Sequence, residues 1–86
     1  MKKIQVTITD PCGFHARPAG KLVQLVKGMD SKVTLSLRDG REVSAARLIA
    51  VMSLGIRCGE EITLRVEGEQ EQRDAAALRA FFEEMS

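Results

Sequence analysis

The residues of this chain that could carry out chemistry are concentrated in one short stretch, Cys12-Gly13-Phe14-His15-Ala16-Arg17-Pro18. His15 is the only histidine of the protein, and Arg17 follows it by two positions. A neutral imidazole nitrogen is a nucleophile at physiological pH, and its attack on phosphorus gives a phosphohistidine. The planar guanidinium of an arginine suits the oxygens of a phosphoryl group. The stretch therefore indicates an anion site with a nucleophile attached.

This stretch lies at the point where a strand pattern gives way to a helical one. Apolar and polar residues alternate in residues 4–8, which predicts a strand with one buried face. Apolar residues then recur at helical spacing and predict a helix over residues 16–27, with Pro18 in its first turn. The N–H groups of Ala16 and Arg17 would have no acceptor within that helix, and together with the helix dipole they would attract an anion.

The rest of the chain predicts further strands and helices. Alternation indicates strands at residues 33–38, 41–43 and 62–67, and the Asp39-Gly40 pair between the first two is typical of a hairpin turn. The apolar residues 47–54 predict a short helix. A C-terminal helix is indicated by apolar residues on one face: Ala75, Leu78, Phe81, Phe82 and Met85.

Because every predicted strand alternates, each has only one face for the core. An antiparallel sheet that is open to water on one face and covered by helices on the other satisfies this pattern. We therefore predict an α+β fold, a two-layer open-faced β-sandwich with the order β-α-β-β-α-β-α and the three helices on one face. The 86 residues contain no linker, repeat or low-complexity segment, which indicates a single domain over residues 1–86.

Composition argues against several classes of partner. The formal net charge is +1, so there is no large field of one sign. Three phenylalanines are the only aromatic residues, too few for a sheet that stacks RNA bases, and we expect no nucleic-acid partner. Met1-Lys2-Lys3 leads into a strand rather than a signal segment, and no apolar run approaches membrane-spanning length. We expect a cytoplasmic protein without membrane insertion.

Spacing alone leaves the role of His15 open, because a histidine can lie at a helix start beside a solvated arginine by chance. Two motifs favour the chemical interpretation. Residues 13–19 (GFHARPA) and 51–55 (VMSLG) resemble the histidine-containing phosphocarrier (HPr) family of the bacterial sugar phosphotransferase system. The resemblance covers the whole chain, with the same order of elements and one apparent extra residue at the Arg38-Asp39-Gly40 turn.

The resemblance implies a fold, a site and partners. The strand order would be 1-4-2-3. Proteins of this family accept a phosphoryl group from phosphorylated enzyme I, which phosphoenolpyruvate charges, and pass it to enzyme IIA domains. The acceptor would be His15, phosphorylated on Nδ1, and Arg17 would be the active-site arginine. Such a protein is a carrier rather than a turnover enzyme. It needs no cofactor, and we expect a monomer.

The resemblance also implies a partner-docking surface around the second helix. Its members would be Leu48, Ile49 and Met52, with Gly20 and Gln24 on the first helix. Exposed apolar groups often mark interaction sites, although these residues could equally be ordinary core. A short helix cannot bury all its sides, and we expect its remaining apolar residues, Val51 and Leu54, to point inward while Leu48 and Ile49 point at least partly outward.

Two departures from the family pattern are informative. Many HPr proteins of low-GC Gram-positive bacteria carry a regulatory serine at the start of the second helix, and alignment through residues 51–55 places Arg47 there. We expect no control by a serine kinase. The second departure is Cys12, which the family's strand order would place at the same edge as His15 and Cys58.

Three alternatives therefore stay open. The leading one is a sugar-type phosphocarrier. A regulatory, nitrogen-type member of the same family is compatible with the missing serine. A metal or redox protein built on Cys12, His15 and Cys58 is from a different class, and chance proximity of free thiols explains these residues more simply. We expect no metal site.

Overall fold

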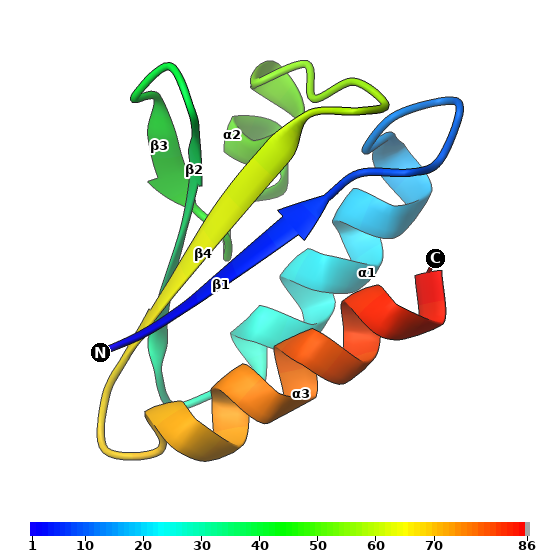
Figure 1. The fold of residues 1–86 in the computed structure, drawn as a ribbon. Helices are drawn as coiled ribbons and strands as arrows, with labels where there is room; N and C mark the ends of the chain where they lie inside the picture. The colour runs from blue at the N-terminus through cyan, green and yellow to red at the C-terminus, as the bar shows by residue number, and fades with distance from the viewer. Residues whose placement is uncertain (86) are drawn as a thin grey trace.

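The computed structural model describes residues 1–85. Four strands form one antiparallel sheet with the order β1-β4-β2-β3. The strands are β1 (Lys2–Thr7), β2 (Lys32–Leu37), β3 (Glu42–Ser44) and β4 (Glu61–Glu67). The helices α1 (Ala16–Lys27), α2 (Leu48–Ser53) and α3 (Glu71–Met85) cover one face of the sheet (Figure 1). The predicted fold class and element order are confirmed, and so is the strand order that the resemblance implied.

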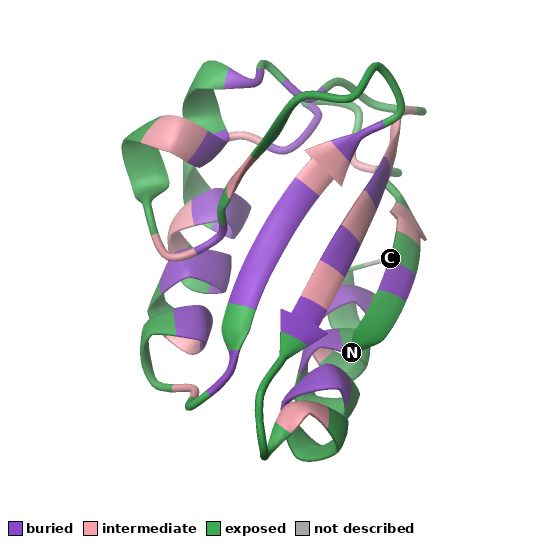
Figure 2. Ribbon diagram, turned by 90° about the vertical axis from the view of Figure 1, so that its left-hand side faces the viewer, coloured by how far each residue is buried: buried purple, intermediate pink, exposed green. Residues whose placement is uncertain are grey.

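The core lies between the sheet and the helices, and β4 is at its centre. Ile62, Leu64 and Val66 are fully buried, while the residues between them are only half-buried on the open face (Figure 2). Leu64 pairs with Ile4 on one side and with Leu35 on the other, so these three side chains form a row across the sheet. The alternation in the sequence thus sets which face of the sheet is buried.

The three helices bury unequal shares of their surfaces. Five residues of α1 are buried, in keeping with its predicted apolar face: Pro18, Ala19, Leu22, Val23 and Val26. The longer α3 buries Ala75, Leu78 and Phe82, but Met85 in its last turn is exposed, contrary to the pattern. The apolar spacing in the sequence continues into this last turn, where the core no longer covers the helix. No helix within residues 1–85 is long and apolar enough to cross a membrane.

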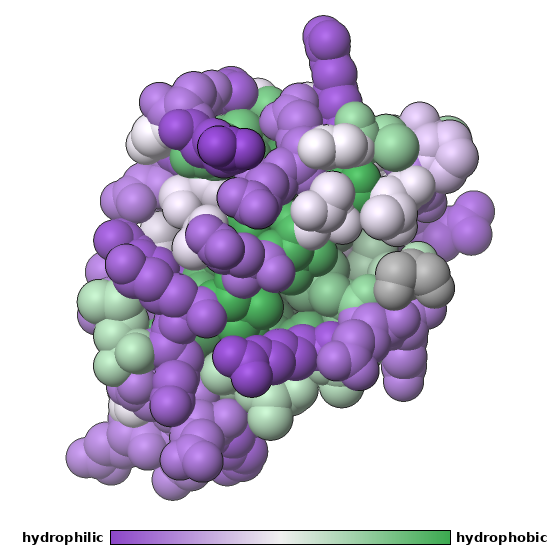
Figure 3. All heavy atoms as spheres, viewed as in Figure 1, coloured by the Kyte–Doolittle hydropathy of each residue, from purple (hydrophilic) through white to green (hydrophobic). Residues whose placement is uncertain are grey.

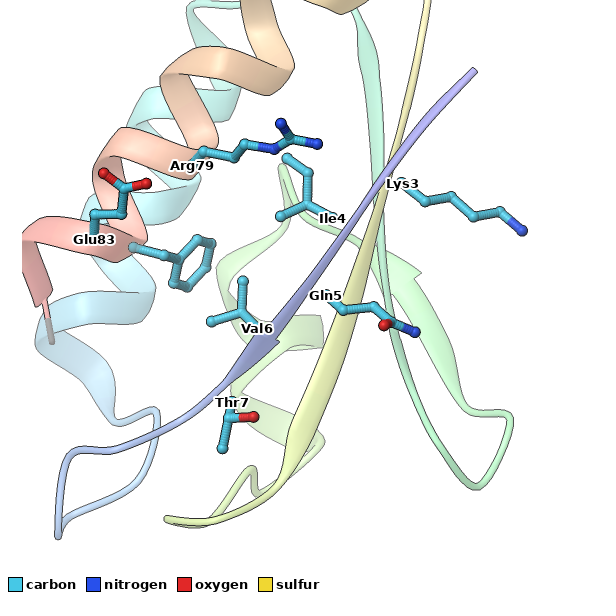
Figure 4. A pocket seen from close by; sticks show the side chains of 8 residues that line it. Lys3, Ile4, Gln5, Val6, Thr7, Arg79 and Glu83 are labelled. Carbon is cyan, nitrogen blue, oxygen red and sulfur yellow. The ribbon is translucent and has the colours of Figure 1, made fainter.

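β1 is an edge strand, and a shallow hollow lies between it and α3 (Figure 4). Ile4 and Val6 point toward α3, and Arg79 and Glu83 border the other side of the hollow (Figure 4). Apolar surface is visible in this region in the space-filling view (Figure 3). The hollow explains why Val6 is only half-buried although it lies on the core-facing side of the strand.

A buried carboxylate ties the start of α3 to the turn before β2. Asp74 is only 3% exposed, and its Oδ2 accepts the N–H of Ser31 at 3.1 Å. Its Oδ1 accepts from Nε of Arg73 at 3.2 Å, and the same arginine reaches Asp30 at 3.1 Å. Hydrogen bonding from Ser31 holds the pKa of Asp74 below its usual range, against the opposing effect of burial.

The lowered pKa of Asp74 predicts acid-sensitive stability. Because the pKa is lower in the folded chain than in the unfolded chain, the contribution is complete above about pH 4 and is lost as the pH falls through the folded-state pKa. We expect Asp74→Asn to lower the free energy of unfolding at pH 7 by about 1–3 kcal/mol. Urea denaturation at pH 7 and pH 3 measures this.

The matched control is Glu69→Gln, which removes one exposed carboxylate just before α3. It should leave the free energy of unfolding nearly unchanged at both pH values. If Asp74→Asn destabilised the protein equally at pH 7 and pH 3, the assigned role of the charge would be wrong.

Candidate functional site

The loop before α1 is held against the loop before β4 by backbone hydrogen bonds. The N–H of Ile8 donates to the carbonyl of Glu60 at 2.9 Å, and the N–H of Gly59 donates to the carbonyl of Ile8 at 2.7 Å. Further along, the N–H of Phe14 donates to the carbonyl of Ile56 at 3.0 Å. These bonds pair the two loops beyond the end of the sheet, and they fix the backbone on which His15 stands.

Gly13 and Phe14 set the approach to His15. Gly13 has a φ of +73°, and a Cβ at this position would lie 2.4 Å from the carbonyl oxygen of Ile56. Only glycine fits this close, left-handed position. Phe14 is buried, with its ring centroid 6.0 Å from that of Phe82 in α3. The residue before the histidine therefore anchors the loop in the core.

His15 stands at the N-terminus of α1, as the sequence predicted. It is the N-cap residue, its carbonyl accepts the N–H of Ala19 at 3.0 Å, and its side chain makes no capping hydrogen bond. The N–H groups of Ala16 and Arg17 come before the donor of that first intrahelical bond, so they have no acceptor within the helix. Pro18 has no N–H to donate. A partly exposed imidazole thus lies beside two amides that have no acceptor within the helix, and beside the positive end of the helix dipole.

Asp10 approaches the imidazole from the preceding loop, which the sequence reasoning missed. Its Oδ2 lies 3.4 Å from Nε2 of His15, and its Oδ1 accepts the N–H of Cys12 at 2.8 Å. The pKa of Asp10 is lowered, first by the hydrogen bond from Cys12 and then by the nearby His15 and Arg17. The available signal was its place in the sequence, as the carboxylate residue of the short loop that leads to the only histidine.

Two hollows meet at His15. The smaller, of about 160 Å³, is bordered by Asp10, Arg17 and Lys21 as well as the histidine. The larger, of about 500 Å³, lies on the other side, between the loops and α2, and Met52 borders it. Lys21 borders the smaller hollow together with Arg17, so two cations of α1 border it.

The apolar residues of α2 and its C-cap residue Leu54 divide as predicted. Val51 and Leu54 are buried, whereas Leu48, Ile49 and Met52 are 36%, 80% and 41% exposed. We call these last three residues the α2 patch. Its member Met52 borders the larger hollow together with His15, so the patch lies next to the histidine. On α1, Gly20 is half-buried and Gln24 is exposed. The role of all five residues in docking stays a prediction.

Cys12 and Cys58 are both exposed free thiols that border the larger hollow with His15. The thiol of Cys58 lies 3.6 Å from the carbonyl oxygen of Thr9. Within residues 1–85, no three side chains of His, Cys, Asp or Glu lie close enough together to hold a metal ion. The two cysteines and His15 therefore do not form the metal site that the sequence left open.

Comparison with known proteins identifies the family. The family model described as the PTS HPr component phosphorylation site matches residues 2–84, nearly the whole of the chain. The chain belongs to the HPr family. The resemblance carried by the motifs at residues 13–19 and 51–55 is thereby confirmed over the full length of the fold.

Relatives named HPr and NPr are both similar to this chain. The phosphocarrier protein HPr of Mycoplasma genitalium is 40% identical over 83 residues, which cover 96% of this chain and 94% of the relative. The phosphocarrier protein NPr of Escherichia coli is 40% identical over 80 residues, which cover 93% and 89%. A crystal structure of an HPr from Thermoanaerobacter tengcongensis superposes with a TM-score of 0.88 at 32% identity, covering 96% and 92%.

Gly13 provides a test of how the site is built. We expect Gly13→Ala to lower the free energy of unfolding by roughly 3 kcal/mol or more, because it combines left-handed strain with a backbone clash. Gly40→Ala is the matched control, since Gly40 also has a positive φ but a Cβ added there would meet no neighbouring atom within 4 Å. Gly40→Ala should lower the free energy of unfolding only through the left-handed strain, by about 1–2 kcal/mol. Urea denaturation measures both, and equal losses would contradict the clash.

Proposed function

We propose that this protein is a phosphoryl carrier that accepts a phosphoryl group on Nδ1 of His15 from phosphorylated enzyme I and passes it to enzyme IIA domains. The observation that supports this most directly is the position of His15 at the N-terminus of α1. There the partly exposed imidazole adjoins the amides of Ala16 and Arg17, which have no acceptor within the helix. Membership of the HPr family supports the same chemistry.

In the proposed transfer, the lone pair of Nδ1 attacks phosphorus and a P–N bond forms. The bond from phosphorus to the donor breaks, and its electron pair stays with the donor. Charge on the phosphoryl oxygens is stabilised by the amides of Ala16 and Arg17, the Arg17 guanidinium and the helix dipole. Onward transfer reverses these events, so the electron pair of the P–N bond returns to Nδ1.

This chemistry describes a carrier rather than a turnover enzyme. The same atom of His15 receives and releases the phosphoryl group, and the partner proteins supply the other reacting groups. No cofactor enters the transfer. We propose a cytoplasmic location, where such partners would meet it, and a monomeric state that leaves both hollows at His15 accessible.

Partner docking is proposed for the α2 patch, with Gly20 and Gln24 on α1 as further members. Apolar side chains that remain 36% to 80% exposed are typical of interaction sites. Because the patch borders a hollow that His15 shares, a partner seated on it would reach the imidazole.

We also propose that the serine switch of some relatives is absent here. Arg47 is the N-cap residue of α2 and makes no side-chain capping bond. An arginine has no hydroxyl to phosphorylate, and its positive charge at a helix N-terminus is opposite to the charge that a phosphoserine would bring.

A nitrogen-type regulatory carrier is the second candidate. The observation that favours it is the 40% identity to NPr of Escherichia coli, equal to that of the Mycoplasma HPr. The two candidates share the chemistry at His15 and differ in their partners. Comparing sugar-type and nitrogen-type enzyme I as donors distinguishes them.

Phosphorylation of His15 is tested with enzyme I and phosphoenolpyruvate. We expect an acid-labile, base-stable phosphate that is absent from His15→Ala. Arg17→Ala should slow labelling roughly tenfold to a hundredfold, as expected for the loss of a charge-assisted hydrogen bond. Arg38→Ala, which removes an exposed arginine from the β2–β3 turn, is the control. Labelling that persists in His15→Ala would refute the assignment.

The α2 patch is tested with Ile49→Glu. A charge at this 80% exposed position should raise the KM for phosphorylation by enzyme I at least about tenfold, because it would be desolvated in an apolar contact. It should leave kcat and protein stability nearly unchanged. Ala80→Glu places the same charge on the exposed side of α3 and should have little effect. Equal KM values for the two variants would exclude docking at Ile49.

A further inference from the structure

We propose that Asp10 is a positioning residue for phosphoryl transfer: its carboxylate holds the His15 proton on Nε2 and so leaves the lone pair of Nδ1 free to attack phosphorus. This inference rests on the proposed role of His15 as the acceptor. It assigns a function to a carboxylate outside the motifs at residues 13–19 and 51–55.

The two carboxylate oxygens of Asp10 have separate tasks. Oδ1 accepts the N–H of Cys12 at 2.8 Å, which closes a turn within the loop and fixes the side-chain plane. Oδ2 is thereby directed at the imidazole, 3.4 Å from Nε2. At this ion-pair distance the negative charge of the carboxylate favours the proton on the nearer ring nitrogen, Nε2. A neutral imidazole with its proton on Nε2 has its lone pair on Nδ1.

The ionised state of Asp10 is supported by its surroundings. The hydrogen bond from Cys12 lowers its pKa most, and His15 and Arg17 lower it further. Arg17 and Lys21 of α1 border the smaller hollow with Asp10, and Arg57 of the loop before β4 borders the larger one. These charges offset the repulsion that the carboxylate would otherwise exert on an incoming phosphoryl group.

The contact would act throughout the transfer. When Nδ1 forms its bond to phosphorus, the ring becomes a cation that keeps the proton on Nε2, and the neighbouring carboxylate stabilises that charge. When the P–N bond breaks toward the next acceptor, its electron pair returns to Nδ1 and the ring is neutral again. No proton enters or leaves Nε2 in either direction, so Asp10 holds one tautomer without being consumed.

The decisive variant is Asp10→Asn. Its side-chain oxygen can still accept the N–H of Cys12, so the turn is retained, but its NH₂ group then faces Nε2. A donor at that position favours a lone pair on Nε2 and moves the proton to Nδ1. Nitrogen-15 NMR of the labelled imidazole, at a pH where the ring is neutral, reports the tautomer ratio. We expect the ratio of Nε2–H to Nδ1–H to fall about two- to fivefold, the range for an exposed charged contact.

Asp39→Asn is a closely matched control. Asp39 also accepts the N–H of the residue two positions on, Arg41, at 3.0 Å, and it lies in the turn between β2 and β3. The substitution therefore removes the same charge and retains the same kind of turn without facing His15. It should leave the tautomer ratio at the wild-type value. An unchanged ratio in Asp10→Asn would overturn the proposal.

Phosphorylation supplies the second readout. With enzyme I and phosphoenolpyruvate, Asp10→Asn should accept phosphate about two- to fivefold more slowly than wild type, through a lower kcat at unchanged KM. A shifted tautomer ratio with an unchanged kcat would overturn the role in transfer. If wild type accepted no phosphate from any enzyme I, the proposed function would fail, whereas the NMR measurement on unphosphorylated protein would still decide whether Asp10 sets the tautomer.

Discussion

The close pairing of the loop before α1 with the loop before β4 is the constraint on which the site depends. Backbone hydrogen bonds join Ile8 to Glu60 and Gly59, and Phe14 to Ile56, so the chain continues a sheet-like contact beyond the last paired residues of β1 and β4. Gly13 is required because the two backbones approach too closely for a Cβ. His15 is thus partly exposed on a backbone that these hydrogen bonds hold in place, as the proposed role of a reactive group open to partners requires.

The charges around His15 are of both signs, and in the proposed function they attract a phosphoryl group and orient the imidazole proton. The N-terminus of α1, Arg17 and Lys21 supply positive charge, and Asp10 supplies one negative charge on the opposite ring nitrogen. A site with cations alone would bind an anion but would not select which nitrogen carries the proton. In our proposal the carboxylate gives the two ring nitrogens different roles, because a negative charge near one nitrogen favours the proton there and leaves the lone pair on the other.

The α2 patch follows from the small size of its helix. With six residues, α2 can bury Val51 against the core, but its other apolar side chains have no neighbouring element within residues 1–85 to cover them fully. In a chain of this length the core is limited, and exposed apolar surface is retained where it serves another purpose. Because Met52 and His15 border the same hollow, the proposed docking surface and the proposed acceptor lie next to each other.

Sequence alone determined the fold class, the element order and the place of His15, since alternation, helical spacing and turn residues are local signals that burial reinforces. The motif at residues 13–19 contains the proposed acceptor, the arginine and the helix start in one short segment. The tertiary structure alone decided what local patterns do not encode. It showed which side chains meet across loops, that Asp10 and Lys21 border one hollow with His15 and Arg17, and that Cys12, Cys58 and His15 form no metal site within residues 1–85. Such contacts depend on side-chain directions, which are set by the packing of the two loops. Met85 likewise could not be placed from its spacing, because the apolar pattern of the last helix continues after the core beside it has ended.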